Sequence, residues 1–133
     1  MTGPTQGIPD DIETVVDFTE TRFNTGVVFD PATNCLSAPE PGIYQISASV
    51  QWNSGSTVGF RSLQIQVDGV PIVVETDEAV DGDSVSTHQA VSTLWALTGE
   101  ECVRVAVQQN SGGLLNIEDV EAFSPEFMMA RVA

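Results

Sequence analysis

The densest run of groups that could hold an ion is the acidic segment ETDEAVDGDS. Asp77, Glu78, Asp81 and Asp83 offer four carboxylates over seven positions, and the glycine between the last two permits a tight bend. Hard oxygen ligands on a flexible loop suit Ca²⁺, although the spacing differs from that of an EF-hand. These residues are therefore the candidate metal ligands, with calcium as the candidate cofactor. The alternative, which the acidity of the whole chain favours, is a solvated loop without metal.

Little in the sequence suggests a catalytic site. His88 is the only histidine, and no G-x-S-x-G nucleophile motif or glycine-rich phosphate loop accompanies it. It lies on an expected strand, where a hydrogen-bonded or solvent-facing histidine is the simpler interpretation. Neighbouring carboxylates say nothing about acid–base work in a chain with 19 acidic residues. We therefore predict no catalytic residue and a protein that is not an enzyme.

The two cysteines, Cys35 and Cys102, are far apart in the sequence and belong to no C-x-x-C motif. A single histidine cannot complete a zinc site with them at any standard spacing. We expect two separate buried thiols, and the sequence leaves a disulfide between them open as the alternative.

The charge balance excludes two classes of partner. The chain has 19 acidic residues against four arginines and no lysine, which gives a formal net charge of −15. Such a chain repels nucleic acid phosphates and anionic membrane surfaces. Molar salt shortens the Debye length to about 3 Å and removes much of the self-repulsion. The balance therefore indicates adaptation to high salt, in a halophile or something that infects one, with an ordinary acidic protein as the alternative.

Length and composition indicate one domain with its own core. The chain has 133 residues, of which 41% are hydrophobic, and no run approaches the ~18 apolar residues that span a bilayer. The N-terminus has neither the basic region nor the apolar run of a signal peptide. We expect either no export by that route or a trimmed chain. Residues 1–13 are predicted to be a lead-in or the end of a linker, and residues 14–133 the folded domain.

Apolar and polar residues alternate along most of the chain, which is the pattern of strands with one buried face. In IYQISASVQWN, every second residue from Tyr44 to Trp52 is apolar or small, and the residues between them are polar. Asp68-Gly69 predicts a tight hairpin between two such strands. The expected strands cover residues 14–18, 25–29, 43–53, 60–67, 71–76, 84–97, 101–109, 114–117 and 120–132. This spacing is typical of an antiparallel sandwich or jelly roll.

The segment PEPG precedes the most regular of these strands. Pro39 and Pro41 fix φ and remove two backbone donors, so this segment cannot enter a sheet interior. Gly42 then permits a sharp turn into strand pairing. We predict a rigid corner that leads into the strand at Tyr44.

The sequence LSAPEPGIY at residues 36–44, with Phe29-Asp30 before it, resembles a motif of the complement C-one-q and tumour necrosis factor superfamily. In that family a Tyr-Asp pair and a small-residue turn precede Phe-Thr-Ala-Pro-x-x-Gly-x-Tyr. The resemblance extends over about residues 14–132, mainly as strand order and spacing. Further short matches are Phe23, Asn24, Gly26, residues 95–97, Gly99-Glu100, residues 103–107 and AFSPEFMMARV at the C-terminus.

The chain also departs from the family pattern at several points. Asn34 stands where glycine is usual, and Cys35 is not at the position of a family disulfide cysteine. A family-type disulfide is therefore not carried over. The collagen stalk of many relatives is missing as well.

The resemblance implies an all-β, ten-strand antiparallel jelly-roll sandwich that forms a homotrimer. In such trimers, side chains of one sheet meet at a threefold axis, and the assemblies are binding heads or structural caps. The matching family strands line that axis, so Tyr44 and Phe127 are the candidate trimer-interface residues. Packing in the core of a single chain is an equal alternative for both.

These expectations together suggest a non-enzymatic structural or binding head, most concretely a virion surface protein. It would be a capsid decoration or a fibre or spike head that serves host attachment, on a virus of a halophilic host. Its partners would be other virion proteins or a host surface receptor. The alternative is a cellular adhesion or ligand-binding module cut from a longer exported protein, at the cell surface or secreted. A sugar-active jelly-roll enzyme is a third hypothesis.

Overall fold

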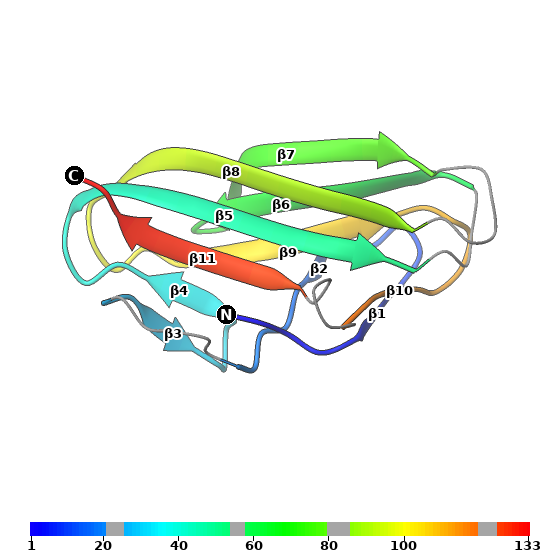
Figure 1. The fold of residues 1–133 in the computed structure, drawn as a ribbon, viewed down its shortest axis with the longest axis horizontal. Helices are drawn as coiled ribbons and strands as arrows, with labels where there is room; N and C mark the ends of the chain where they lie inside the picture. Colours follow the sequence, from blue (N-terminus) through cyan, green and yellow to red (C-terminus); the bar gives the residue numbers. More distant parts are fainter. Residues whose placement is uncertain (21–25, 54–57, 80–85, 120–124) are drawn as a thin grey trace.

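A computed structural model shows two antiparallel β-sheets packed against each other as a sandwich (Figure 1). It describes residues 1–20, 26–53, 58–79, 86–119 and 125–133. The described strands are β1 (Gln6–Ile8), β2 (Thr14–Val15), β3 (Val28–Asp30), β4 (Cys35–Ser37), β5 (Gly42–Trp52), β6 (Phe60–Val67), β7 (Val70–Glu78), β8 (Thr87–Leu97), β9 (Val103–Gln109), β10 (Leu115–Ile117) and β11 (Glu126–Arg131). The predicted all-β sandwich is confirmed, with eleven described strands where the resemblance implied ten.

The five-stranded sheet is built around β5. This strand pairs with β8 along its whole length and with β11 from Tyr44 to Ser49 on its other side. Past the end of the β11 pairing, at the last residue of β5, Trp52 pairs with Ile117 of β10. β10 in turn pairs with β1. The long strand β5 therefore holds β8 and β11 in one continuous layer, as Figure 1 shows.

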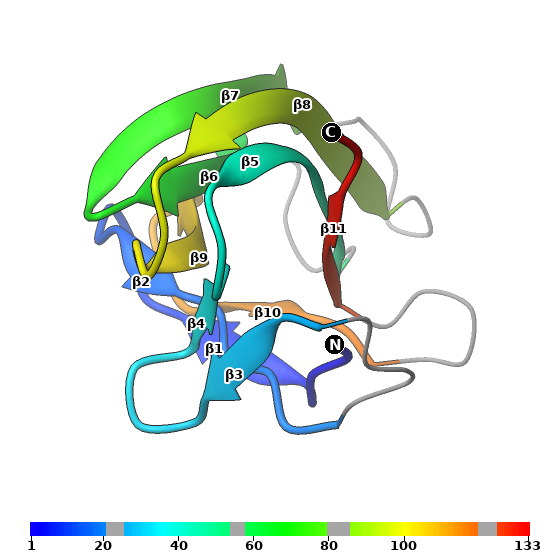
Figure 2. The same ribbon diagram turned by 90° about the vertical axis from the view of Figure 1, so that its left-hand side faces the viewer.

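The six-stranded sheet has the order β3-β4-β9-β6-β7, with β2 also paired to β9. β6 runs between β9 and β7, and both pairings are antiparallel. Seen from the end of the molecule, the two layers curve around a common interior (Figure 2). Each sheet takes strands from both halves of the sequence, so neither half of the chain forms a layer alone.

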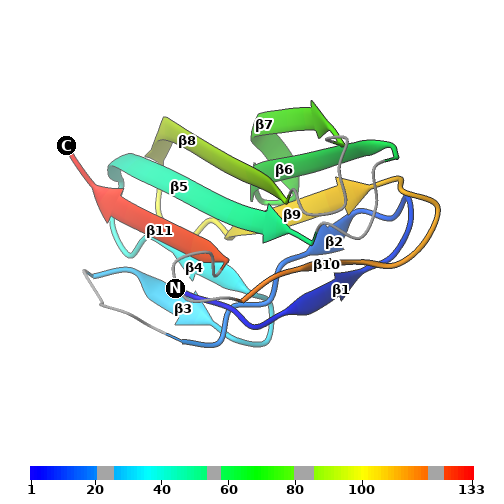
Figure 3. The same cartoon turned by 45° about the vertical axis from the view of Figure 1, so that its right-hand side comes forward.

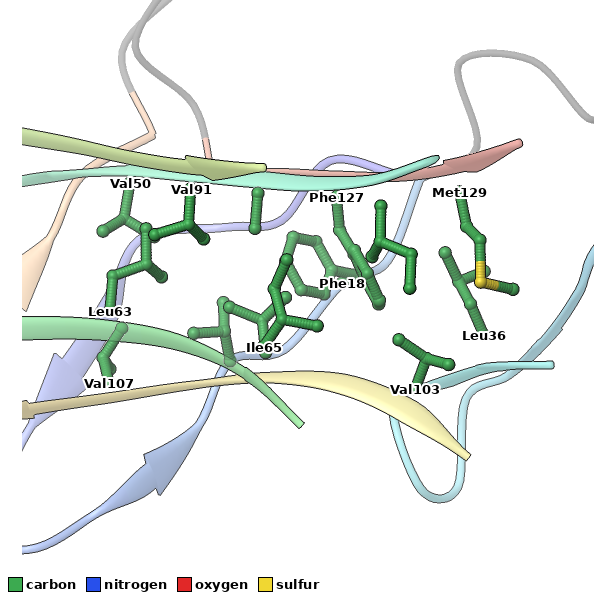
Figure 4. Packing of buried hydrophobic residues seen from close by; sticks show 14 of the residues in the cluster. Phe18, Leu36, Val50, Leu63, Ile65, Val91, Val103, Val107, Phe127 and Met129 are labelled. Carbon is green, nitrogen blue, oxygen red and sulfur yellow. The ribbon is translucent and has the colours of Figure 1, made fainter. Parts of the chain in front are cut away.

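The core forms because the inner faces of both sheets carry the apolar members of the alternating strands. Tyr44, Ile46, Ala48, Val50 and Trp52 are all buried, as the alternation predicted. Side chains of β6 and β9 meet them from the other sheet, as the labelled residues in Figure 4 show. Each fully buried aliphatic side chain of this kind contributes ~1.5–3 kcal/mol of transfer free energy. This burial is what fixes the register of β5.

The first residues of the chain, which we expected to lead into the domain, pack against it. β1 pairs with β10, the two strands lying side by side in Figure 3, and Ile8 is fully buried. The amide of Gly3 donates to the carbonyl of Pro125, and the amide of Phe127 donates to the carbonyl of Met1. No periodic pattern marks this segment, which contains two prolines and two glycines.

The other differences from the expected strands include β7, which extends to Glu78, and several short elements. The strand expected at residues 25–29 begins at Val28, and its partner β4 was not predicted at all. Three residues are too few to show a period of two. The strand expected at residues 120–132 is present from Glu126 to Arg131, and residues 120–124 lie outside the described part of the chain.

The corner before β5 has the role that the sequence predicted. The Tyr44 hydroxyl donates to the Glu40 carbonyl at 2.9 Å, which ties the proline segment to the strand that follows. Gly42 packs closely against the C-terminal segment: a Cβ there would lie 2.7 Å from the carbonyl oxygen of Ala133. At the other predicted turn, Asp68 and Gly69 both have positive φ, at 49° and 82°. The hairpin between β6 and β7 is therefore confirmed.

A buried polar network connects the two sheets at one end of the sandwich. Gln89 of β8 is fully buried and accepts a hydrogen bond from the indole Nε1 of Trp52 at 2.8 Å. Its Nε2 donates to the Arg61 carbonyl at 2.9 Å and to the Asp77 carboxylate at 3.0 Å. The Arg61 side chain is buried too, and its Nη1 donates to the Val58 carbonyl at 2.9 Å. Burial lowers the pKa of Arg61, which nevertheless keeps its charge in proteins.

Cys35 and Cys102 form a disulfide, so the expectation of two separate thiols is wrong and the alternative is correct. Their Cα atoms lie 5.1 Å apart, because the pairing of Leu36 with Val103 brings β4 beside β9. The bond closes a loop between residues 67 positions apart. By reducing the conformational entropy of the unfolded chain, a crosslink that closes a loop of that length adds about 4 kcal/mol to the free energy of unfolding.

Candidate functional site

The outer face of β11, β5 and β8 carries few charged residues. Successive side chains of a strand point to opposite faces, so the residues between the buried ones form this face. They are Ile43, Gln45, Ser47, Ser49 and Gln51 of β5, His88, Ala90, Ser92, Leu94 and Ala96 of β8, and Glu126, Met128 and Ala130 of β11. We refer to these residues as the outer face. Glu126 is its only acidic residue and His88 its only other titratable one.

This shortage of charge stands out in a chain with a net charge of −15. Most described acidic residues lie elsewhere, on loops and on the edges of the sandwich, and are exposed. Examples are Asp10, Asp17, Asp30, Asp68 and Glu100. Charged residues are depleted at the centres of protein interfaces. A sheet face with a single carboxylate is therefore a surface suited to contact another protein.

A hollow of about 370 Å³ lies over the middle of the outer face. Its floor is formed by small side chains, among them Ser47 and Ser49 of β5 and Ala90 and Ser92 of β8. Met1, Glu126 and Met128 line it as well. Small residues on paired strands leave space above the sheet, and this space is open to a side chain from outside.

Apolar side chains gather at the end of the outer face where β5 begins. Ile43 is 42% exposed and Leu94 62% exposed, and Val132, which follows β11, is 54% exposed. Ile43 lies directly opposite Ala96, and the Val132 amide donates to the Ile43 carbonyl, so these residues are neighbours. The face thus combines a hollow lined by small residues with an exposed apolar end.

The two predicted interface residues lie on the inner side of the same sheet. Tyr44 is 3% exposed and Phe127 1% exposed. The Phe127 ring packs against Phe18 with ring centroids 5.4 Å apart. These positions are those of the core alternative for both residues. The side chains of β5 and β11 that reach the surface are their alternating neighbours, such as Ser47 and Met128.

The outer face could have been found by following the alternation to its other side. The alternation of β5 places its polar residues on the face opposite the core. Their lack of charge in so acidic a chain was the available signal. The hollow could not be found in this way, because it depends on the pairing of β5 with β8 and β11.

The candidate calcium loop lies only partly within the described residues. Asp77 accepts the hydrogen bond from Gln89, and Glu78 is exposed opposite Phe60. Asp81 and Asp83 lie outside the described part of the chain. Within that part, no group of three or more His, Cys, Asp or Glu side chains is placed to hold a metal ion. The calcium site stays a prediction.

His88 is exposed at the end of the outer face, opposite Gln51. This agrees with the solvent-facing interpretation of the residue. The residues of β5 that pair with this part of β8, from Gln51 to Gln45, are all uncharged.

Glu101 has a perturbed carboxyl group at the turn between β8 and β9. Burial by itself would raise its pKa, but hydrogen bonds from the amides of Thr98 and Gly99 and from the Thr98 hydroxyl outweigh this and lower it. The turn bends beside the disulfide, since Cys102 is the next residue. The ionised carboxylate therefore stabilises this turn.

The chain matches no known family model and no curated protein. The described residues contain no helix long and apolar enough to cross a membrane.

Proposed function

We propose that this protein is a non-enzymatic head that assembles into a homotrimer through the outer face and serves a structural or binding role. The observation that carries the proposal is the absence of charge, apart from Glu126 and His88, on one broad face of a chain with net charge −15. Burial of this face in an assembly would cost little desolvation of charges. It would also remove exposed apolar side chains such as Leu94 from water.

The proposal includes a jelly-roll connectivity for the sandwich. Its support is the way in which the chain alternates between layers: β4 and β9 belong to one sheet, and β5, β8 and β11 to the other. The resemblance of residues 36–44 to the trimeric superfamily supports the threefold assembly. The corner at Gly42 and Tyr44 on which that resemblance rests is tightly packed.

The place of action that we propose is the surface of a virion that infects a halophilic host. Disulfides persist in oxidising surroundings outside the cytosol, so the Cys35–Cys102 bond favours an extracellular particle or surface. The acidic surface favours high salt. The disulfide equally favours the second candidate, an adhesion or ligand-binding module of a longer exported protein.

Light scattering in about 3 M salt, which screens the acidic surface, tests the assembly. The trimer predicts three times the chain mass of 14.2 kDa, or a multiple of the trimer. Ser47→Glu places a charge in the hollow at the centre of the outer face and should dissociate the threefold contact. Thr76→Glu, an exposed change on the other sheet, is the matched control and should leave the mass unchanged. A wild-type monomer, or a Ser47→Glu variant that keeps the wild-type mass, would contradict the proposal.

A further inference from the structure

The edge of the five-stranded sheet at β8 carries backbone groups that no described strand pairs. Their direction follows from the ladder. Ile43 of β5 uses both its amide and its carbonyl toward the C-terminal segment, with Ala133 and Val132. It therefore forms no ladder bond with Ala96, its partner in β8. In an antiparallel pair this pattern alternates, so the even-numbered residues of β8 point their N–H and C=O groups away from β5.

Hydrogen bonds at both ends of the strand confirm this direction. The Ala90 amide donates to the Glu75 carboxylate at 3.1 Å, and the Thr98 amide donates to the Glu101 carboxylate at 3.0 Å. Between these two side-chain caps, Ser92, Leu94 and Ala96 turn their amides and carbonyls to the free edge, and all three residues are exposed. The Leu94 carbonyl accepts a bond of 3.3 Å from the Thr93 hydroxyl. In Figure 1, β8 extends well past the start of β7.

Several other described edges are protected, and this segment of β8 is not. β7 carries Pro71 together with the acidic side chains of its second half. Residues 1–3 lie along the edge of β11, through the bonds of Gly3 and Met1. β1 and β3 have only three residues each. Proline, charge, cover and short length are the usual means of preventing edge pairing. From Ala90 to Leu97, β8 has neither charge nor proline.

We propose that Ser92, Leu94 and Ala96 form an antiparallel strand pair with the same residues of a second copy. The register centred on Leu94 places this residue opposite itself and Ser92 opposite Ala96 of the second copy. It uses every amide and carbonyl that points to the free edge in hydrogen-bonded pairs. Two exposed Leu94 side chains meet on the outer face, and no charge lies between the paired segments. The result is one sheet that continues across two molecules.

The same register sets a salt requirement. It places Ala90 opposite Thr98 of the second copy, so the two caps, Glu75 and Glu101, come close together at each end of the paired segment. Like charges repel across about 10 Å in 0.1 M salt but only about 3 Å in 1 M salt. Pairing should therefore hold in molar salt and weaken on dilution into low salt.

This contact lies at the edge of the sheet, whereas the proposed threefold contact lies on its outer face. Each combination of the two contacts predicts a different mass for the assembly, which light scattering in about 3 M salt measures. Both contacts together give a sixfold or larger mass. The threefold contact alone gives three times the chain mass, pairing alone gives twice, and neither gives the monomer. A wild-type mass that is an even multiple supports the β8 contact, and a threefold or monomeric mass overturns it.

Leu94→Pro tests the contact directly, because it removes an amide that points outward and leaves the ladder to β5 intact. Leu94→Lys is the second variant, in case the first does not fold, and it keeps the amide while adding an edge charge. Loss of the β8 contact should reduce the wild-type mass to that of the trimer, or to that of the monomer if the threefold contact is absent or is lost with the exposed Leu94 side chain. Val74→Lys, at a residue of β7 that is 53% exposed, is the matched control and should not change it. Hydrogen exchange should show the Ser92, Leu94 and Ala96 amides protected in the wild type and exposed in Leu94→Lys. Unchanged mass and protection in both Leu94 variants would overturn the proposal.

Discussion

The indole of Trp52 donates a hydrogen bond of 2.8 Å to the Gln89 carboxamide, and this amide in turn bonds groups of the opposite sheet. One side chain thus links β5 and β8 to β6 and β7. A buried donor or acceptor that loses its partner costs about 1–3 kcal/mol.

Gln89→Leu should therefore be strongly destabilising, although the new side chain is apolar and similar in size. The indole and the Asp77 carboxylate both lose their partner, so we expect a loss of about 2–5 kcal/mol in the free energy of unfolding. Urea denaturation in high salt measures it. Gln108→Leu, which removes a more exposed bond to Asp11, should cost much less. If Gln89→Leu lowered the free energy of unfolding as little as Gln108→Leu does, the network would not stabilise the fold.

Reduction of the Cys35–Cys102 bond should lower the free energy of unfolding by up to about 4 kcal/mol. The reason is that the open chain gains conformational freedom in the unfolded state. Denaturation with and without a reductant measures the difference. The double variant Cys35→Ala, Cys102→Ala is the control, since its stability must not respond to the reductant.

Acid should weaken the turn between β8 and β9 through Glu101. The pKa of this carboxyl is lowered in the folded state, so its contribution is present above the unfolded pKa, near 4.5, and is lost as the pH falls through the folded pKa. Glu101→Gln should lower the melting temperature at pH 7, and the difference from wild type should shrink in acid. Glu100→Gln removes the same charge from the same turn but none of the hydrogen bonds to the Glu101 carboxylate, so it controls for the change in net charge. A difference that stays constant with pH would contradict this role.

Low salt should destabilise the folded protein. The net charge of −15 sits mainly on exposed side chains, and its self-repulsion grows as the Debye length rises from about 3 Å at 1 M salt to about 30 Å at 0.01 M. Melting curves across this range should shift steadily downward on dilution. A melting temperature independent of salt would contradict adaptation to high salt.

Calcium should raise the melting temperature if the predicted acidic loop binds it, because a ligand of the native state stabilises that state. Asp81→Ala together with Asp83→Ala should abolish the shift. Magnesium at the same concentration controls for charge screening. An unchanged melting temperature of the parent protein in calcium would rule out the candidate site.

The long strands could be predicted because their period of two directly reports which face is buried. β5, β6 and β9 have the expected extents within a few residues, and the turn at Asp68 and Gly69 follows from two residue types. The short strands β1 and β4, which were not predicted, owe their existence to partners far away in the sequence. Their pairing with β10 or β9 is a tertiary contact, which no local pattern reports.

The candidate interaction surface was predictable only in part. The alternation of β5 showed that one face is polar, but not that β8 and β11 extend it into a broad surface with a single carboxylate. Tyr44 and Phe127 were chosen for their size and their strands, and burial in the core satisfies both properties. The disulfide likewise depends on the pairing of β4 with β9.

The Cys35–Cys102 bond also decides how the protein would respond to a pulling force on its two ends. Force applied at the termini passes through the bond, and the segment between the two cysteines, with β5, β6, β7 and β8, carries no tension. Only the residues outside that segment can be drawn out. At about 3.5 Å per residue the chain would lengthen to roughly 230 Å, about half of its full contour. Under such a force the protein would keep these four strands, together with Leu36 and Ser37 of β4, in a covalently closed unit that bears no tension.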